Sequence, residues 1–171
     1  MKKINIEIKA KSDNNHKIRS ILKDKNADFK GIDHQLDTYF NVTEGRLKLR
    51  QGNIENSLIF YKRDDSSQPK ESNVTLYRTK SSEDLKEVLE NALGVRITVD
   101  KQREIYFIDN VKFHLDKVKN LGEFIEIEAI GSNESERENL LKQCNYYLQL
   151  FEIKKEDLIS VSYSDMLLQQ K

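Results

Sequence analysis

Charged side chains alternate with apolar ones in several separate segments of this chain, and that pattern most constrains its fold. The clearest segment opens the chain, where Asn5, Glu7 and Lys9 alternate with Ile4, Ile6, Ile8 and Ala10. A repeat of two residues predicts a β-strand with one apolar and one polar face. The same period returns at Lys48 and Arg50, Lys101 and Arg103, His114 and Asp116, and Glu126 and Glu128.

The polar faces of these strands leave two interpretations open. They could meet water, as one face of an antiparallel sheet commonly does. Alternatively, the sheet curls until its polar face lines an interior, which would gather charges of both signs into one site. A lining of that kind suits a polyanion held together with metal ions.

Strand and helix signals predict an α+β fold in a single domain over residues 1–171. Helical spacing predicts a helix from a cap at 12–14 to about Asn26, one from Ser81 or Ser82 to Gly94, and one from Asn133. A tail over 154–168 predicts one or two more short helices. Eight strands are expected at about 3–11, 35–42, 46–51, 57–63, 72–78, 97–108, 111–118 and 123–130.

Each predicted helix carries one apolar stripe, which needs an apolar sheet face to cover. Eight antiparallel strands are also enough to close into a barrel, which removes exposed sheet edges. We therefore expect an eight-stranded antiparallel β-barrel or tunnel with the helices packed outside.

Composition narrows the class of protein. The chain has 29 Lys and Arg against 29 Asp and Glu, and this balance disfavours a broad nucleic-acid footprint. The single cysteine, Cys144, excludes an intramolecular disulfide and falls on a helical apolar stripe, so we expect it in the core. Signal-peptide and membrane-spanning patterns are absent from the sequence. These features favour a cytoplasmic monomer or homodimer with no nucleic-acid or membrane partner.

Six motifs in order resemble one known family. They are NIEIKAK at 5–11, HQLDTYFNV at 34–42, GRLKLRQ at 45–51, LIFYKR at 58–63, VDKQREIYF at 99–107 and VKFHLDKVKNLGEFIEIEA at 111–129. Together with the tail SYSDMLL at 162–168, they resemble the CYTH superfamily, the triphosphate tunnel metalloenzymes. This superfamily includes class IV adenylyl cyclases, thiamine triphosphatases and inorganic triphosphatases.

The resemblance implies a tunnel that holds a triphosphate with Mg²⁺ or Mn²⁺. The implied metal ligands are Glu7, Glu126 and Glu128, and the implied catalytic residues are Lys9, Asp116 and Glu128. Arginine forks and lysine point charges suit phosphate oxygens, and clustered carboxylates suit hard divalent cations. The implied phosphate-binding residues are Lys9, Lys48, Arg50, Lys62, Lys101 and Arg103.

Two positions depart from the family pattern. Asn5 stands where the E-x-E-x-K signature has its first glutamate, so one metal ligand loses its charge. Lys70, Ser72 and Val74 stand where many members carry an Arg-x-Glu-x-Glu-like pattern. The substrate therefore stays open within the family.

Several side chains allow both a functional and a packing interpretation. His114 lies beside Asp116 at strand spacing and could shuttle a proton, contact phosphate or serve the structure. Tyr39, Tyr61 and Tyr106 could stack on a substrate, although strand tyrosines are more often packing residues. The sequence contains no P-loop, Rossmann fingerprint or nucleophile elbow.

The expected activity is that of a class IV adenylyl cyclase-like enzyme, which converts ATP to cyclic AMP and pyrophosphate. Hydrolysis of thiamine triphosphate or inorganic triphosphate is the first alternative, because it would use the same site. A tunnel that binds a nucleotide or polyphosphate without turning it over is the second, and Asn5 motivates it.

Overall fold

The computed structural model describes residues 4–62, 73–80 and 83–171 of the chain. Its centre is one antiparallel sheet in the order β5-β4-β3-β2-β6-β7-β8-β1-β9. The strands are β1 (Ile4–Lys11), β2 (Asp28–Phe40), β3 (Arg46–Gln51), β4 (Ser57–Lys62), β5 (Asn73–Arg78), β6 (Val95–Ile108), β7 (Val111–Val118), β8 (Gly122–Gly131) and β9 (Leu158–Ile159). The helices are α1 (Asn15–Asp24), α2 (Glu83–Leu93), α3 (Arg137–Leu150) and α4 (Tyr163–Gln169), with short 3-10 turns η1 (Glu134–Glu136) and η2 (Lys155–Asp157).

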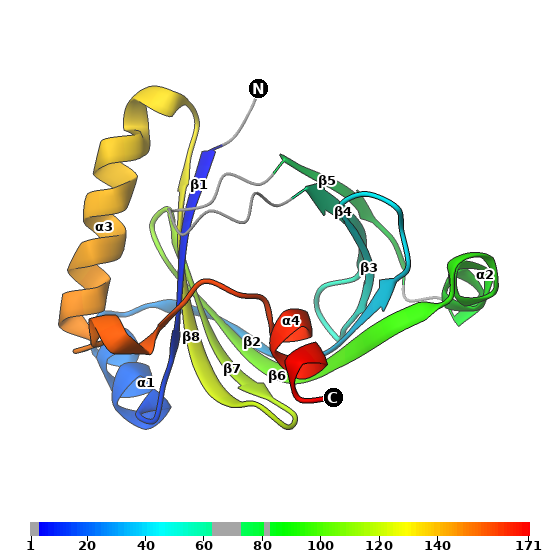
Figure 1. Cartoon of the computed structure of the whole chain (residues 1–171). Helices are drawn as coiled ribbons and strands as arrows, with labels where there is room; N and C mark the ends of the chain where they lie inside the picture. The colour runs from blue at the N-terminus through cyan, green and yellow to red at the C-terminus, as the bar shows by residue number, and fades with distance from the viewer. Residues whose placement is uncertain (1–3, 63–72, 81–82) are drawn as a thin grey trace.

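The sheet curls strongly about a hollow centre (Figure 1). Its edge strands are β5 and β9, and within the described residues no backbone pairing joins these two edges. The predicted α+β class and curled antiparallel sheet are therefore confirmed, as a partly open barrel. The described sheet has nine strands where eight were predicted, because the short β9 pairs with Lys9 and Ala10 of β1.

Helices α1 and α3 cover the outer face of β1, β8 and β7 (Figure 1). This face is apolar because every second residue of these strands points outward. Phe113 of β7 is fully buried there and contacts Tyr147 and Phe151 edge-on, with ring centroids 4.7 and 5.7 Å away. Cys144 lies in the same core, as predicted.

A second apolar cluster lies on the inner face, at the end of the barrel where α4 packs. Residues two positions apart on a strand point to the same face of the sheet. Val99 precedes Lys101 by two positions and Phe124 precedes Glu126 by two, so the strand residues of this cluster lie on the same inner face as the polar residues. Helix α4 therefore fills one end of the curled sheet. The buried members of the cluster are Tyr39, Ile97, Val99, Val118, Phe124 and Tyr163.

Strand β2 begins at Asp28, whereas the sequence predicted a strand only from about residue 35. Its first part pairs with β6 through a register shift between Phe29 and Gly31. Gly31 adopts φ of 125°, a conformation that favours glycine, so the bulge depends on that residue. Residues 28–34 include Gly31 and several charged residues, so they show no clear alternation of apolar and polar side chains and the sequence did not predict this part of the strand.

The helix predictions hold with small changes at the ends. Helix α2 stops at Gly94, which has φ of 73°, as predicted. The third helix opens with the 3-10 turn η1, and Asn133 caps that turn by accepting from Ser135 N. Residues 63–72 lie outside the described residues, and with them lie the end of the strand predicted at 57–63, the start of the one predicted at 72–78, and Lys70 and Ser72.

Helix α2 differs from α1 and α3 in how it packs. Within Glu83–Leu93 it buries no side chain fully, and Val88 is 63% exposed. Across the described residues, no helix combines the length and apolar character that crossing a membrane requires.

Candidate functional site

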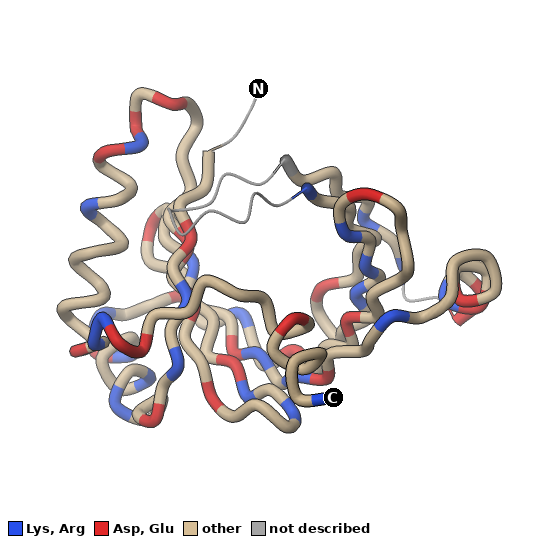
Figure 2. Tube along the Cα trace, viewed as in Figure 1, with Lys and Arg blue, Asp and Glu red and all other residues tan. Residues whose placement is uncertain are grey.

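The inner face of the curled sheet encloses a cavity of about 1570 Å³. Positions of Lys or Arg and of Asp or Glu recur along the strands of the curled sheet (Figure 2). The interior interpretation of the polar faces is therefore the one that the structure adopts. Eight of the predicted site residues line this cavity: Glu7, Lys9, Lys48, Arg50, Lys101, Arg103, Glu126 and Glu128.

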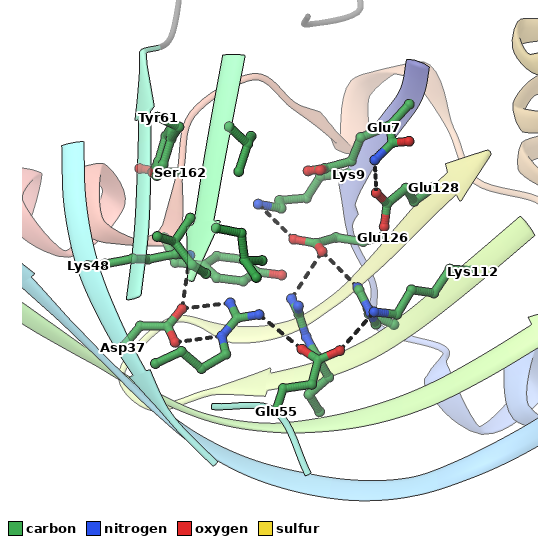
Figure 3. Close-up of a pocket in the computed structure, with 18 of the residues that line it drawn as sticks. Glu7, Lys9, Asp37, Lys48, Glu55, Tyr61, Lys112, Glu126, Glu128 and Ser162 are labelled. Atoms are coloured by element: carbon green, nitrogen blue, oxygen red, sulfur yellow. Dashed lines mark hydrogen bonds and ion pairs between the residues drawn. The ribbon is translucent and has the colours of Figure 1, made fainter. Parts of the chain in front are cut away.

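Three of the cations meet at one buried carboxylate, Asp37 of β2 (Figure 3). Arg50 forks onto it, with Nε–Oδ1 and Nη2–Oδ2 distances of 2.8 Å each. Lys101 Nζ lies 2.9 Å and Lys48 Nζ 3.1 Å from Oδ2. Burial opposes ionisation, but the charges of Arg50, Lys101 and Lys48 outweigh it and hold the pKa of Asp37 well below its usual range.

A second carboxylate, Glu55, enters the cavity from the loop between β3 and β4. Asp33 holds this loop by accepting from the backbone N–H groups of Ile54 at 2.8 Å and Glu55 at 2.9 Å. Glu55 then pairs with Lys112 at 2.9 Å and Arg50 at 3.1 Å. Burial opposes ionisation, yet Lys112 and Arg50 lower the pKa of Glu55 to about 2.

Another cluster forms around Glu126 of β8. Lys9 Nζ lies 2.9 Å from Oε1, while Arg103 Nη2 and His114 Nδ1 each lie 3.0 Å from Oε2. Arg103 also forks onto Asp116, at 2.7 and 2.5 Å. Burial opposes ionisation of both carboxyls, but Arg103 and the other nearby cations lower their pKa values.

Two buried basic groups in these clusters are easily neutralised. Burial lowers the pKa of Lys101 to about 7, although Asp37 opposes the shift. Burial and the charge of Arg103 lower the pKa of His114 to about 4, so this imidazole is neutral at pH 7. At pH 7 the positive charge of the cavity therefore comes from its arginines and lysines and not from His114.

Further along β1 and β8, two carboxylates face each other across the strand pair. Glu7 and Glu128 are direct cross-strand neighbours. Asn5 Nδ2 donates to Glu128 Oε1 at 2.7 Å. Burial, with the charge of Glu7, raises the pKa of Glu128 to about 7. A positive charge placed between these carboxylates would relieve their repulsion.

The predicted metal ligands thus share one wall but are not equivalent. Glu126 is occupied by Lys9, Arg103 and His114, whereas Glu128 takes a single described hydrogen bond, from Asn5. Over residues 4–62, 73–80 and 83–171, no three His, Cys, Asp or Glu side chains are close enough to hold a metal ion.

Two predicted residues lie elsewhere. Lys62 does not line the cavity; its side chain is 61% exposed and pairs with Glu44 at 2.8 Å. The inner residues of β4 are Ser57, Ile59 and Tyr61, so Lys62 has the opposite parity. Asp116 is fully buried behind Arg103 and is not part of the cavity lining.

The sequence interpretation missed four residues that take part in the site. Asp37 and Lys112 have the parity of their inner neighbours Tyr39 and His114, so the period of two could have found them. Tyr163 lay in a familiar motif without an assigned role. Glu55 has no sequence signal, because only the tertiary contacts of its loop bring it into the cavity.

Comparison with known proteins agrees with this geometry. The family model for the CYTH domain matches residues 3–163. The chain belongs to the CYTH domain family. It is 28% identical over 174 residues to MJ0240 of Methanocaldococcus jannaschii, whose name proposes an adenylate cyclase, and the match covers 95% of this chain and 98% of that protein.

Solved structures share the CYTH fold of this chain. The PH1012 protein of Pyrococcus horikoshii is 25% identical with a TM-score of 0.80, and the match covers 95% of this chain and 98% of that one. A Hippeastrum protein described as having a dominant triphosphatase activity is 14% identical with a TM-score of 0.65, over 99% of this chain and 97% of that one. At that identity the second likeness concerns the fold alone.

Proposed function

We propose that this CYTH protein is a divalent-metal-dependent enzyme that acts on a triphosphate inside the cavity. Cyclisation of ATP to cyclic AMP and pyrophosphate is the first candidate reaction. Hydrolysis of a triphosphate, such as thiamine triphosphate or tripolyphosphate, is the second. Both reactions use a chain of phosphates bound to cations, and they differ in which phosphorus is attacked.

One observation carries the proposal: the cations of β1, β3 and β6 converge in a single cavity. Lys9, Lys48, Arg50, Lys101 and Arg103 all line it, and Arg103 is only 4% exposed. Buried cations are costly unless anions accompany them, and here the protein supplies Asp37, Asp116 and Glu126. A triphosphate carries several charges and can share these donors, because each arginine and lysine has more N–H groups than one carboxylate uses.

Glu7 and Glu128 fit the role of holding Mg²⁺ or Mn²⁺ together with phosphate oxygens. These are oxygen donors, and burial together with the charge of Glu7 raises the pKa of Glu128, an effect that a cation held by both carboxylates would oppose. Mg²⁺ is usually bound through one or two carboxylates and substrate phosphates, so a preformed cage of three carboxylates is not required. When bound, such a cation neutralises phosphate charge and polarises the reacting phosphorus.

The residues of this chain would supply binding, orientation and charge. Arg50 and Arg103 offer planar forks for non-bridging phosphate oxygens, and Lys9 lies between them and the Glu7–Glu128 pair. Catalysis of phosphoryl transfer consists largely of positioning and electrostatic stabilisation, which this lining can provide. A phosphate that reaches Arg50 and Lys112 must compete with Glu55, so substrate binding is expected to shift that carboxylate.

Separate findings support the two reactions. Cyclisation is supported by the M. jannaschii relative, whose name proposes an adenylate cyclase and which aligns over nearly its full length. Hydrolysis is supported by the Hippeastrum protein, because the same fold there carries triphosphatase activity. A cyclase must align the ribose 3′-hydroxyl with the α-phosphorus, whereas a hydrolase aligns water with the γ-phosphorus.

The deciding experiment is a product analysis. Purified protein is incubated with Mg²⁺ or Mn²⁺ and with ATP, thiamine triphosphate or tripolyphosphate, and products are identified by phosphorus NMR and chromatography. Cyclic AMP with pyrophosphate supports cyclisation, and release of orthophosphate supports hydrolysis. Saturable binding without any product would instead support the non-catalytic tunnel, in which Asn5 has weakened the metal site.

Matched alanine variants separate the cavity from the surface. Arg50→Ala should weaken turnover and binding, because it removes a fork from the lining. Lys62→Ala removes a cation of the same sheet that points away from the cavity, and it should leave turnover and binding unchanged. Equal effects of the two substitutions would contradict a site inside the cavity.

A further inference from the structure

The C-terminal segment reaches into the cavity from outside the main sheet. It pairs with β1 through β9, then turns into α4 at Ser162, whose hydroxyl accepts from Asp165 N at 3.2 Å. Arg46 of β3 ties the turn from the other side, donating to Ser162 Oγ at 2.7 Å and pairing with Asp165 at 2.9 Å. These contacts anchor the first residue of α4, Tyr163, at the end of the cavity.

Tyr163 contacts one acidic and one basic side chain at the edge of the Glu126 cluster, Asp116 and Lys9. Its hydroxyl donates to Asp116 Oδ2 at 2.8 Å. Lys9 Nζ lies over the face of its ring, 4.2 Å from the centroid. The side chain is 5% exposed, and its ring packs on Phe124 with centroids 4.9 Å apart.

These contacts complete a closed circuit of five side chains from five elements. Tyr163 donates to Asp116, Asp116 accepts the fork of Arg103, Arg103 donates to Glu126, and Glu126 accepts Lys9. Lys9 then returns to the ring of Tyr163. The tyrosine enters this circuit through two separate groups, its hydroxyl on Asp116 and its π face under Lys9.

We propose that Tyr163 is a positioning residue that fixes the directions of Arg103 and Lys9 for binding the phosphate chain. This inference rests on the proposed function of the cavity and adds the C-terminal helix to the site. The hydroxyl occupies a lone pair of Asp116, which keeps that carboxylate in the plane of the arginine fork. The ring attracts the ammonium of Lys9 while leaving its remaining N–H donors available.

Two substitutions at this position separate the two contacts. Tyr163→Phe keeps the ring and removes the hydroxyl, and Tyr163→Leu removes both. The loss of one hydrogen bond should weaken tripolyphosphate binding about threefold to tenfold. The additional loss of the cation–π contact should bring the total to tenfold or more. Tyr147→Phe is the matched control, because it removes a hydroxyl from a buried tyrosine in the outer core and should not change binding.

The test measures tripolyphosphate binding by calorimetry and folding by thermal unfolding for each variant. A double-mutant cycle with Lys9→Met adds a readout that a structural role would not move. In the Lys9→Met background, the extra loss of affinity in Tyr163→Leu over Tyr163→Phe should shrink, because the ring has lost its nearer cation and keeps only Lys101 Nζ, 5.9 Å from the centroid. Tyr163→Phe keeps the packing of the ring. It therefore tests whether the hydrogen bond from the hydroxyl to Asp116 contributes to binding, even if Tyr163→Leu does not fold.

The outcomes distinguish this inference from the function on which it rests. If the wild-type protein does not bind tripolyphosphate, the proposed function fails. If the wild-type protein binds tripolyphosphate and both Tyr163 variants bind it as tightly as wild type does, Tyr163 is not a positioning residue. The same conclusion follows if Tyr147→Phe weakens binding as much as Tyr163→Phe does. If the losses of tripolyphosphate affinity caused by Lys9→Met and by Tyr163→Leu simply add in the double variant, the contact between the ring and Lys9 does not contribute to binding.

Discussion

The two halves of the curled sheet contribute the same kind of charged side chain from very different surroundings. In the covered half, formed by β6, β7, β8 and β1, helices α1 and α3 bury the outer face. In the open half, formed by β3, β4 and β5, Tyr77 on the outer face of the edge strand is 67% exposed, while Val74 and Leu76 on its cavity side are 52% and 51% exposed. The cavity thus has one wall backed by a core and one wall with little behind it.

Arg103 and Arg50 illustrate what the difference means for the site. Arg103 belongs to the covered half, and its partner Asp116 is fully buried. Arg50 belongs to the open half; it forks onto the buried Asp37, and its second partner, Glu55, is 29% exposed on a loop. We infer that the covered half sets a fixed geometry, whereas the open half can adjust when a phosphate chain enters.

The largest expected contrast concerns apolar packing. Phe113→Ala should lower the free energy of unfolding by about 3–5 kcal/mol, because it leaves a cavity beneath α3. Leu76→Ala, at a half-exposed position of β5, should cost about 0.5 kcal/mol or less. Urea denaturation of both variants measures this contrast. Similar costs would mean that the open half is packed as tightly as the covered half.

The second contrast compares the two arginines. Arg103→Ala leaves the buried Asp116 without its cation, so the free energy of unfolding should fall by about 3 kcal/mol. Arg50→Ala leaves Asp37 paired with Lys48 and Lys101, and the cost should be about 1 kcal/mol. Both variants should bind tripolyphosphate at least tenfold more weakly, since each loses a charge-assisted fork.

Calorimetric titration of the folded variants checks the affinities, and denaturation checks the stabilities. If Arg50→Ala unfolds the protein while the surviving fraction binds normally, Arg50 is a structural residue.

How far the sequence predicts these features depends on how one-sided each strand is. Strand β1 alternates strictly between apolar and charged residues, so the inner placement of Glu7 and Lys9 follows from its pattern. Strand β4 reads Ser57, Leu58, Ile59, Phe60, Tyr61, Lys62, with bulky apolar side chains on both faces, so parity is ambiguous and Lys62 was assigned to the wrong face.

Loop and C-terminal contributions are less accessible from sequence. Glu55 reaches the cavity only because Asp33, 22 residues earlier on β2, accepts from two backbone N–H groups of its loop. Tyr163 belongs to a short helix whose position depends on Arg46 and on β9. Such contacts join distant parts of the chain, and no local period encodes them.

A pH-dependent contrast tests the loop of the open half. The pKa of Glu55 falls from its ordinary 4.5 to about 2 on folding, so its ion pairs stabilise the protein above pH 4.5 and lose that effect as pH drops towards 2. The free energy of unfolding of the wild-type protein should therefore exceed that of Glu55→Gln by about 2 kcal/mol at neutral pH. Denaturation curves at a series of pH values measure the difference.

The gap between wild type and Glu55→Gln should narrow between pH 4.5 and 2. Protonation of His114 near pH 4 adds a positive charge that favours ionised Glu55, so it does not fully cancel in this difference. A gap that stays constant down to pH 2 would show that the charge of Glu55 does not stabilise the loop.

The smallest expected effect concerns Asn5 at the mouth of the covered half. Asn5→Glu replaces the donor to Glu128 with a third negative charge near Glu7, so Mg²⁺ or Mn²⁺ should bind about tenfold more tightly. Asn5→Ala removes the donor without adding charge and serves as the control. Metal titration of the three proteins under matched conditions gives the affinities. Unchanged metal affinity with reduced turnover in Asn5→Glu would show that the asparagine has a role of its own.

The most direct measurement of the central claim is a crystal structure of the protein with Mg²⁺ and a non-hydrolysable ATP analogue. The account predicts that the phosphate chain lies inside the curled sheet, contacts Arg50 and Arg103 from opposite halves, and brings the cation to Glu7 and Glu128. A phosphate chain bound on the outer face, or a saturated crystal with an empty cavity, would contradict it.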